Sequence, residues 1–190
     1  MVWLVPALLA AAISGALPPE NAINSTRAPA AAHVERRRVP DYDALLNAPD
    51  RRVRATHPEI QALIARGMRR STTFAALVAE LDNTDLIVYV ERVHNLPAII
   101  LGRLLLVSAT PHQRYVRVQL GTGGTTSDAI ATLAHELQHA VELGTAPDVR
   151  DQEALARFYQ RIGQNSVGAH TYDTGAAQNT GKRVRKEIEG

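Results

Sequence analysis

The segment from Thr125 to Gly144 constrains the fold of this chain more than any other. Thr125 followed by Asp128 is the pattern of a capping box, and Gly144 stands where a helix would end. Four apolar side chains recur at helical spacing and form one stripe: Ile130, Leu133, Leu137 and Val141. Because this stripe has to be buried, the sequence predicts a long helix that packs on the core.

The segments around this helix give the fold class. Strands are predicted in DLIVYVERV, GRLLLVSAT and RYVRVQL. RYVRVQL alternates apolar with polar residues, which predicts an exposed or edge strand. Helical spacing predicts two helices before the strands, in PEIQALIARGMRR and STTFAALVAELDN, and two after the long helix, in DVRDQEALARFYQRIG and TGAAQNTGKRVRKEIEG. The expected fold class is α+β, with a small mixed sheet of about three strands.

The N-terminal part of the chain differs in composition from the rest. Residues 1–16 are apolar from Val2 to Ala16, too short for a comfortable membrane span, and end in small residues. We expect them to be the hydrophobic region of an export signal, which predicts a periplasmic or secreted protein. If they are not a signal, the protein is expected in the cytoplasm. Residues 17–54 are rich in proline and are expected to be a linker, so that the folded domain spans 55–190.

Composition excludes several classes of function. The chain has no cysteine, so thiol catalysis, disulfides and cysteine-ligated metal sites are ruled out. The net charge is only +2, the basic residues are scattered, and aromatic residues make up 4% of the chain. No surface of interleaved basic and aromatic residues results, so we expect no nucleic-acid partner. We also expect a monomer, with no membrane contact beyond the N-terminal segment.

Two histidines and a glutamate in the long helix form the pattern His-Glu-x-x-His. His135 and His139 are one turn apart and leave the helix on the same face, so they can hold one Zn²⁺ with bonds of about 2.0–2.1 Å. Glu136 points beside such an ion, where it can take a proton from zinc-bound water and pass it to a leaving amine. In the context of strand, loop and capped helix, the pattern is typical of a zinc hydrolase.

At HELQH the chain resembles the zincin metallopeptidases. It is also similar to a group of uncharacterised bacterial zincin-like proteins at RYVRVQL, AHELQHAVEL, RFYQRIG and YDTGAAQNTGKRVRKEI. The resemblance implies a zincin-like domain over residues 55–190, a zinc cofactor and a peptide or protein substrate whose peptide bonds are hydrolysed. It implies His135 and His139 as metal ligands and Glu136 as general base and acid.

The third zinc ligand stays open between two acidic residues. Glu153 lies early in the next predicted helix and comes level with His139 if that helix folds back antiparallel, a gluzincin-like placement. Asp173, which precedes the last predicted helix, is favoured by the looser resemblance. Glu142 shares the face of His139 but lies too far along the helix axis, which suits a side chain that holds His139 rather than the metal.

The rest of the expected active site is less specified. Tyr172 is the candidate for stabilising an oxyanion, and Tyr159 and His170 are further options. RYVRVQL is the expected wall of the cleft, because an exposed strand can bind a peptide through main-chain hydrogen bonds.

Two other functions compete with peptide hydrolysis. One is a non-catalytic zinc-binding or interaction module on the same scaffold, which keeps the ligands without a substrate pocket. The other is a di-iron carboxylate protein, because Glu91 and His94 repeat the Glu-x-x-His spacing found at Glu136 and His139. The di-iron alternative requires four long helices that carry ligands, whereas the second copy of the spacing ends a predicted strand.

Overall fold

A computed structural model describes residues 48, 50–97, 99–165 and 172–190. The expected export signal at 1–16 and most of the expected linker at 17–54 lie outside these residues. The described elements are, in chain order, β1 (Val53–Ala55), α2 (Pro58–Arg70), α3 (Thr72–Leu81), β2 (Leu86–Arg92), β3 (Gly102–Ala109), β4 (Arg114–Leu120), α4 (Thr126–Gly144), α5 (Gln152–Ile162), β5 (Gln164–Asn165), β6 (Tyr172–Asp173) and α6 (Gly175–Glu189). None of these helices has the length and apolar character needed to span a membrane.

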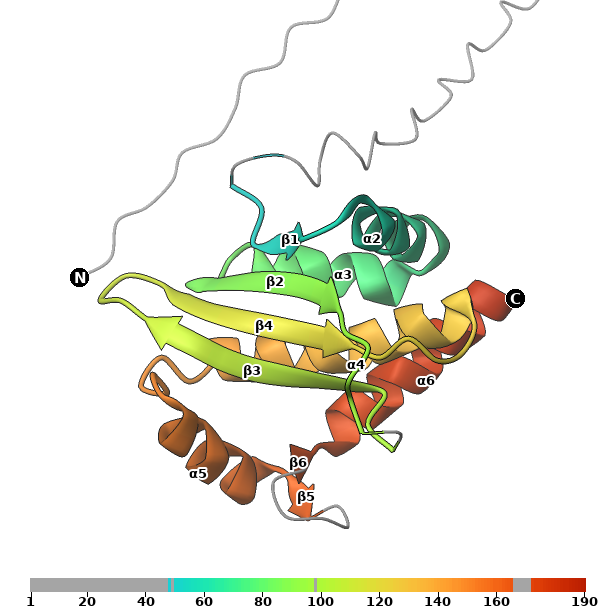
Figure 1. Ribbon diagram of the computed structural model, residues 1–190. Helices are drawn as coiled ribbons and strands as arrows, with labels where there is room; N and C mark the ends of the chain where they lie inside the picture. The colour runs from blue at the N-terminus through green and yellow to red at the C-terminus, as the bar shows by residue number, and fades with distance from the viewer. Residues whose placement is uncertain (1–47, 49, 98, 166–171) are drawn as a thin grey trace, which may run out of the picture. The chain divides into compact units, whose positions relative to one another are not determined.

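The main sheet has four strands in the order β1-β2-β4-β3 (Figure 1). β1, β2 and β4 are parallel, and β3 runs antiparallel to β4. β5 and β6 form a separate short antiparallel pair. The α+β class expected from the sequence is confirmed, with a mixed sheet of four strands instead of about three.

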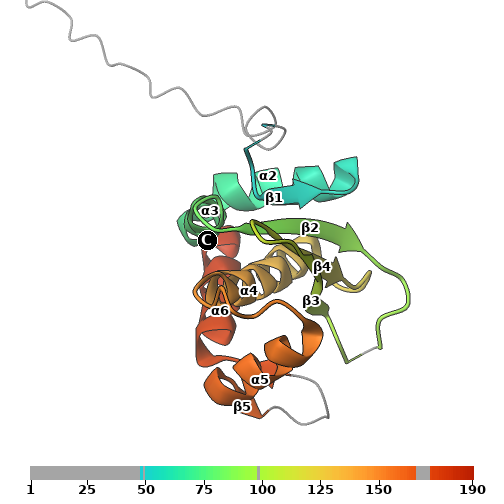
Figure 2. The same ribbon diagram turned by 90° about the vertical axis from the view of Figure 1, so that its left-hand side faces the viewer.

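Helices cover one face of the main sheet. The long helix α4 packs against β2, β4 and β3 on one side and against α6 on the other, as Figures 1 and 2 show. The apolar stripe predicted for this helix is buried, and Leu133 and Leu137 are fully enclosed. The capping box of Thr125 and Asp128 at its start is present as predicted.

The other face of the sheet carries a row of polar side chains. Arg103 donates to the Gln119 side-chain oxygen at 2.6 Å, and Gln119 in turn donates to Glu91 at 2.6 Å. These residues lie on β3, β4 and β2, so the row crosses three strands. The polar alternation of RYVRVQL therefore marks a polar sheet face.

Two expectations about the sheet are wrong. RYVRVQL is β4, which lies between β2 and β3, so it is not an edge strand; the edge beside it is β3. The expected linker also ends too late, because β1 begins at Val53, which is fully buried and pairs with Val88 of β2. Three residues are too few to give a periodic signal, which is why this strand was not predicted.

A buried arginine fastens the C-terminal end of α4 to the sheet. Arg114, at the start of β4, has no exposed surface and donates to the backbone carbonyls of Leu143, Ala146 and Val149 at 2.7–3.1 Å. It also forms two hydrogen bonds to the Asp85 carboxylate at 2.6 and 2.8 Å. These hydrogen bonds hold the end of the helix and the turn that leads to α5.

Candidate metal centre

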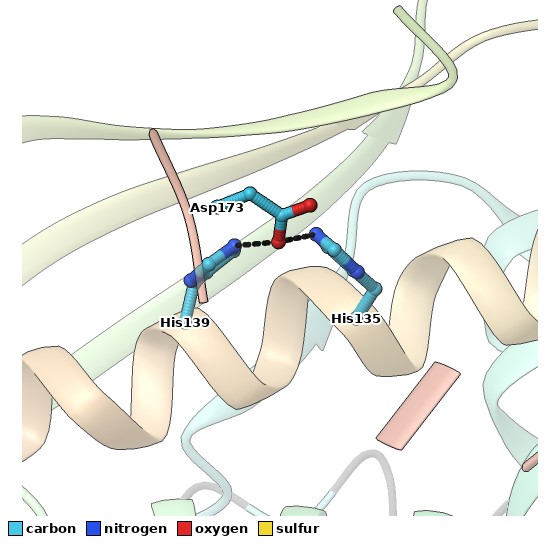
Figure 3. A group of neighbouring side chains, drawn as sticks. All are labelled: His135, His139 and Asp173. Carbon is cyan, nitrogen blue, oxygen red and sulfur yellow. Dashed lines mark ion pairs between the residues drawn. The ribbon is translucent and has the colours of Figure 1, made fainter. Parts of the chain in front are cut away.

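Three potential metal ligands converge above α4. His135 and His139 lie one turn apart on this helix, and Asp173 enters from β6, as Figure 3 shows. The Oδ1 atom of Asp173 is 3.4 Å from Nε2 of His135 and 3.9 Å from Nε2 of His139. The ligand atoms of all three residues lie within 4.8 Å of one another. Each residue therefore turns one donor atom toward a common point.

Asp173 is held by one carboxylate oxygen and offers the other. Its Oδ2 atom accepts a hydrogen bond from the side-chain amide of Gln178 at 2.8 Å. Its Oδ1 atom is buried and has no hydrogen-bond partner. A buried carboxylate oxygen without a donor is costly, so its position between two imidazole nitrogens indicates a site for a cation.

The orientation of His139 is fixed from both sides of its ring. Its Nδ1 atom lies 3.0 Å from Oε2 of Glu142, the arrangement in which the carboxylate accepts the Nδ1 proton and Nε2 keeps its lone pair. The other oxygen of Glu142 accepts from the Thr174 hydroxyl at 2.6 Å. Glu142 thus links one histidine to the residue next to Asp173. The Tyr159 hydroxyl also donates to the His139 backbone carbonyl, at 2.8 Å.

The edge of the His135 ring that points away from Asp173 faces α6. It makes a hydrogen bond to the backbone of Ala177. Gly181 lies so close that a Cβ atom there would be 3.5 Å from the Cβ atom of His135. Burial, and then the neighbouring His139, lower the pKa of His135, which favours the neutral imidazole that binds a metal.

The pKa of His139 moves in the other direction. Burial acts to lower it, but the hydrogen bond that His139 donates to Glu142 and the nearby carboxylates of Glu136 and Asp173 outweigh this effect and raise the pKa. The His139 imidazole therefore sits in a negative environment, which a bound cation would neutralise.

Glu136 lies at the floor of a shared cleft, on the side of α4 that faces the edge strand β3. Its side chain is buried, and burial together with Asp173 raises its pKa to about 7, against the opposing effect of His139. A Cβ atom at Gly102, the first residue of β3, would come within 3.1 Å of the Glu136 carboxylate and within 2.7 Å of Thr132. Only a glycine lets the strand approach the helix so closely at this point.

A cleft of about 900 Å³ runs over this cluster. Its floor is α4, one wall is the segment from Ile99 to Leu105, and the other wall is α6. α5 closes one end through Gln152, Leu155, Ala156 and Tyr159. The candidate ligands and Glu136 all line the cleft, so an extended ligand could reach them.

Glu153 is not near the histidines, and the expected placement of this residue is wrong. Its side chain is 84% exposed and pairs with Arg157, one turn further along α5. The buried face of α5 consists of Leu155, Phe158 and Tyr159. Glu153 precedes Leu155 by two residues, about 200° around a helix, and so points the other way. It is Tyr159 that comes level with His139, and Asp173 is the carboxylate that joins the pair.

The other candidates have different outcomes. Tyr172 pairs with Asn165 through the backbone, but its side chain and all of His170 lie outside the described residues. The Tyr159 hydroxyl donates a hydrogen bond to the backbone carbonyl of His139. Glu91 belongs to the polar row on the sheet face and takes no part in the metal cluster.

Three residues of the site were not anticipated: Gly102, Thr174 and Gln178. Thr174 and Gln178 lie at the start of α6, four residues apart, a spacing that puts them on one helix face. The spacing of Thr174 and Gln178 indicates a role at the site only once Asp173 is known to be a ligand candidate. Gly102 opens a strand, where glycine is unfavourable, and this is a signal of close approach by another element.

Comparison of the chain with protein-family models, with curated proteins and with solved structures gives no match.

Proposed function

We propose that this chain is a zinc-dependent metallopeptidase with a zincin-like site, in which His135, His139 and Asp173 hold the ion and Glu136 is the general base. The observation that carries the proposal is the buried, unpartnered Oδ1 atom of Asp173, which faces Nε2 of both histidines at 3.4 and 3.9 Å. The carboxylate that the mechanism needs as a base, that of Glu136, lines the same cleft.

The donor set fits zinc. Two imidazole nitrogens and one carboxylate oxygen are the ligands of many catalytic zinc sites, which keep a fourth position open. Bonds of about 2.0–2.1 Å in a tetrahedron separate neighbouring ligand atoms by roughly 3.4 Å, close to the distances between Asp173 and the two histidines. When bound, zinc supplies a Lewis acid that stabilises negative charge on oxygen.

The protein's own groups perform the proton transfers. Glu136 takes a proton from the attacking water and gives it to the nitrogen of the leaving amine. Its position next to Gly102 keeps it out of bulk solvent, in the same cleft as the residues that would hold the ion. Glu142 holds His139 by Nδ1 and keeps its Nε2 atom directed at the cluster.

The edge strand supports a peptide substrate. β3 has β4 on one side only, and Ile99 to Leu105 line the cleft. An extended peptide can therefore add to β3 through main-chain hydrogen bonds and cross the metal cluster. A non-catalytic zinc-binding module has no use for Glu136, so the role of this residue separates the two alternatives.

Glu136→Gln tests the proposal. Glutamine keeps the shape of the side chain but cannot accept the proton, so zinc content should stay at about one ion per chain while hydrolysis of a mixed peptide library falls by about 10²–10⁴-fold. Cleavage is followed by mass spectrometry and zinc by atomic absorption. A wild-type protein that holds zinc fully and cleaves nothing in the library would be a binding module.

A further inference from the structure

Outside the metal cluster and Glu136, the charged residues that line the cleft are basic. Apart from Glu136 and the metal cluster, the charged residues among the described lining residues are all basic: Arg103, Lys182 and Arg185. Gln152 and Gln178 are the remaining polar lining residues with long side chains, and both are neutral. Away from the metal ligands and Glu136, the described lining of the cleft therefore includes basic residues and no carboxylate.

Not all of this charge is balanced by the protein. Arg185 pairs with Asp128 at 2.5 Å. The Arg103 side chain points to the other face of the sheet, where it donates to the side-chain oxygen of Gln119, so its charge does not face the cleft. Lys182 is exposed, and none of the described residues offers it an acidic partner. Lys182 thus presents its positive charge to the cleft from the α6 wall.

Lys182 also lies close to the metal cluster. Gly181, directly before it, approaches the backbone carbonyl of Ala131 and the side chain of His135. Gln178, one turn earlier on the same helix, holds Asp173. A ligand side chain that reaches Lys182 is therefore part of a chain segment that passes over the histidines.

The opposite edge of the same part of the cleft is apolar. Ile99 and Leu101 are 87% and 61% exposed, which is unusual for large aliphatic side chains. Both line the cleft, next to Gly102 and the Glu136 carboxylate. A large apolar side chain of a ligand can cover them while an adjacent carboxylate meets Lys182.

From this distribution we infer that the cleft selects acidic peptides, with a glutamate or aspartate side chain bound by Lys182 beside a large apolar residue. The inference deepens the proposed function, since it names the substrate class of the same site. The recognition itself requires only binding in the cleft.

Lys182 and Lys186 provide a matched pair of variants. Both are exposed lysines on α6, one turn apart, but only Lys182 lines the cleft. Lys182→Glu and Lys186→Glu change the net charge of the protein by the same amount. A difference between them therefore reports on the cleft and not on the overall field of the protein.

The probes are three peptides that differ at one position, glutamate, glutamine or lysine, next to a constant leucine. We expect wild-type protein to cleave the glutamate peptide with a kcat/KM about tenfold above that of the lysine peptide, because an attractive exposed contact with Lys182 is replaced by a repulsive one. Lys182→Glu should remove or reverse this preference, and Lys186→Glu should leave it within about twofold.

Binding separates this inference from the proposed function. Labelled versions of the peptides are titrated against zinc-loaded Glu136→Gln by fluorescence anisotropy. If wild type cleaves none of the peptides but the glutamate peptide binds best, through Lys182, the peptidase proposal fails and the inference stands. If all three are cleaved or bound equally, or if Lys186→Glu has as large an effect as Lys182→Glu, the inference is wrong. It is also wrong if a single-stranded oligonucleotide binds through Lys182 more tightly than the acidic peptide.

Discussion

The two halves of the metal site are built in different ways. His135, His139 and Glu136 come from five consecutive residues of α4, a helix that is capped at its start and fastened by Arg114 at its end. Asp173 comes from a two-residue strand more than thirty positions later, and its carboxylate is held by a hydrogen bond from Gln178. The first half is fixed by the helix backbone, whereas the second depends on contacts between elements.

Glu142 joins the two halves. One oxygen of its carboxylate orients His139, and the other accepts from Thr174, the N-cap of α6 and the neighbour of Asp173. A shift of α6 would therefore affect the positions of both His139 and Asp173. We therefore expect zinc affinity to depend also on side chains that do not contact the ion but keep Asp173 in position.

The largest effect should follow from removing the ligand of the second half. Asp173→Ala takes away the carboxylate ligand of the cluster, so we expect zinc affinity to fall by more than the roughly 100-fold that marks the upper range for indirect effects. Glu153→Ala, on the exposed side of α5, is the control and should bind zinc like wild type. Competition with a chromophoric chelator measures both. A loss of affinity in Glu153→Ala alone would restore the gluzincin-like assignment.

A smaller effect is expected from the link between the halves. Glu142→Ala frees Nδ1 of His139 and releases Thr174, so zinc affinity should fall by about 10–100-fold. Thr174→Val should produce part of this loss, and Thr174→Ser, which keeps the hydroxyl, should restore most of it. The same chelator titration gives all three values. Equal affinity in Thr174→Val and wild type would mean that the two halves are independent.

The smallest effect on zinc is expected from the scaffold under α4. Asp85→Asn weakens the support of Arg114 far from the ligands, so zinc affinity should stay within about threefold of wild type. The free energy of unfolding at neutral pH should nevertheless fall by about 1–3 kcal/mol, the usual scale for hydrogen bonds to charged groups. If Asp85→Asn lost zinc affinity in proportion to its loss of stability, the positions of the two histidines on α4 would depend on the contacts of Arg114 at the end of that helix.

The same pair predicts a dependence of stability on pH. The hydrogen bond from Arg114 lowers the pKa of Asp85 below its ordinary value in the folded protein. A lowered folded pKa contributes stability above the unfolded value of about 3.9, and this contribution is lost as the pH falls through the folded pKa. Urea unfolding of wild type and Asp85→Asn should therefore differ most at neutral pH and converge below about pH 4.

The contrast between the halves also explains what could be predicted from the sequence. The capping box at Thr125, the apolar stripe and the shared face of His135 and His139 follow from local sequence patterns, and all are present, whereas Gly144 is the last residue of the helix and Thr145 is its C-cap. The choice between Glu153 and Asp173 depends on how α5 and α6 return to α4, which no local period encodes. The buried face of α5 argued against Glu153, since Leu155 and Tyr159 lie on the opposite side of the helix.

The edge strand illustrates the same limit. Alternation in RYVRVQL indicates that one face of a strand is polar, and this is correct for Arg117, which is exposed. It does not indicate whether the strand has one neighbour or two, because pairing uses the backbone and leaves no trace in the side chains. The order β2-β4-β3 puts β4 inside the sheet.

Anomalous diffraction from crystals of the zinc-loaded protein tests the central claim, that two separately built halves meet at one ion. Data collected on both sides of the zinc absorption edge locate the ion without prior assumptions about its ligands. The account predicts one peak per chain, bonded to Nε2 of His135, Nε2 of His139 and Oδ1 of Asp173 at about 2.0–2.2 Å. A peak that is bonded to the two histidines but not to Asp173, or a peak elsewhere in the chain, would contradict it.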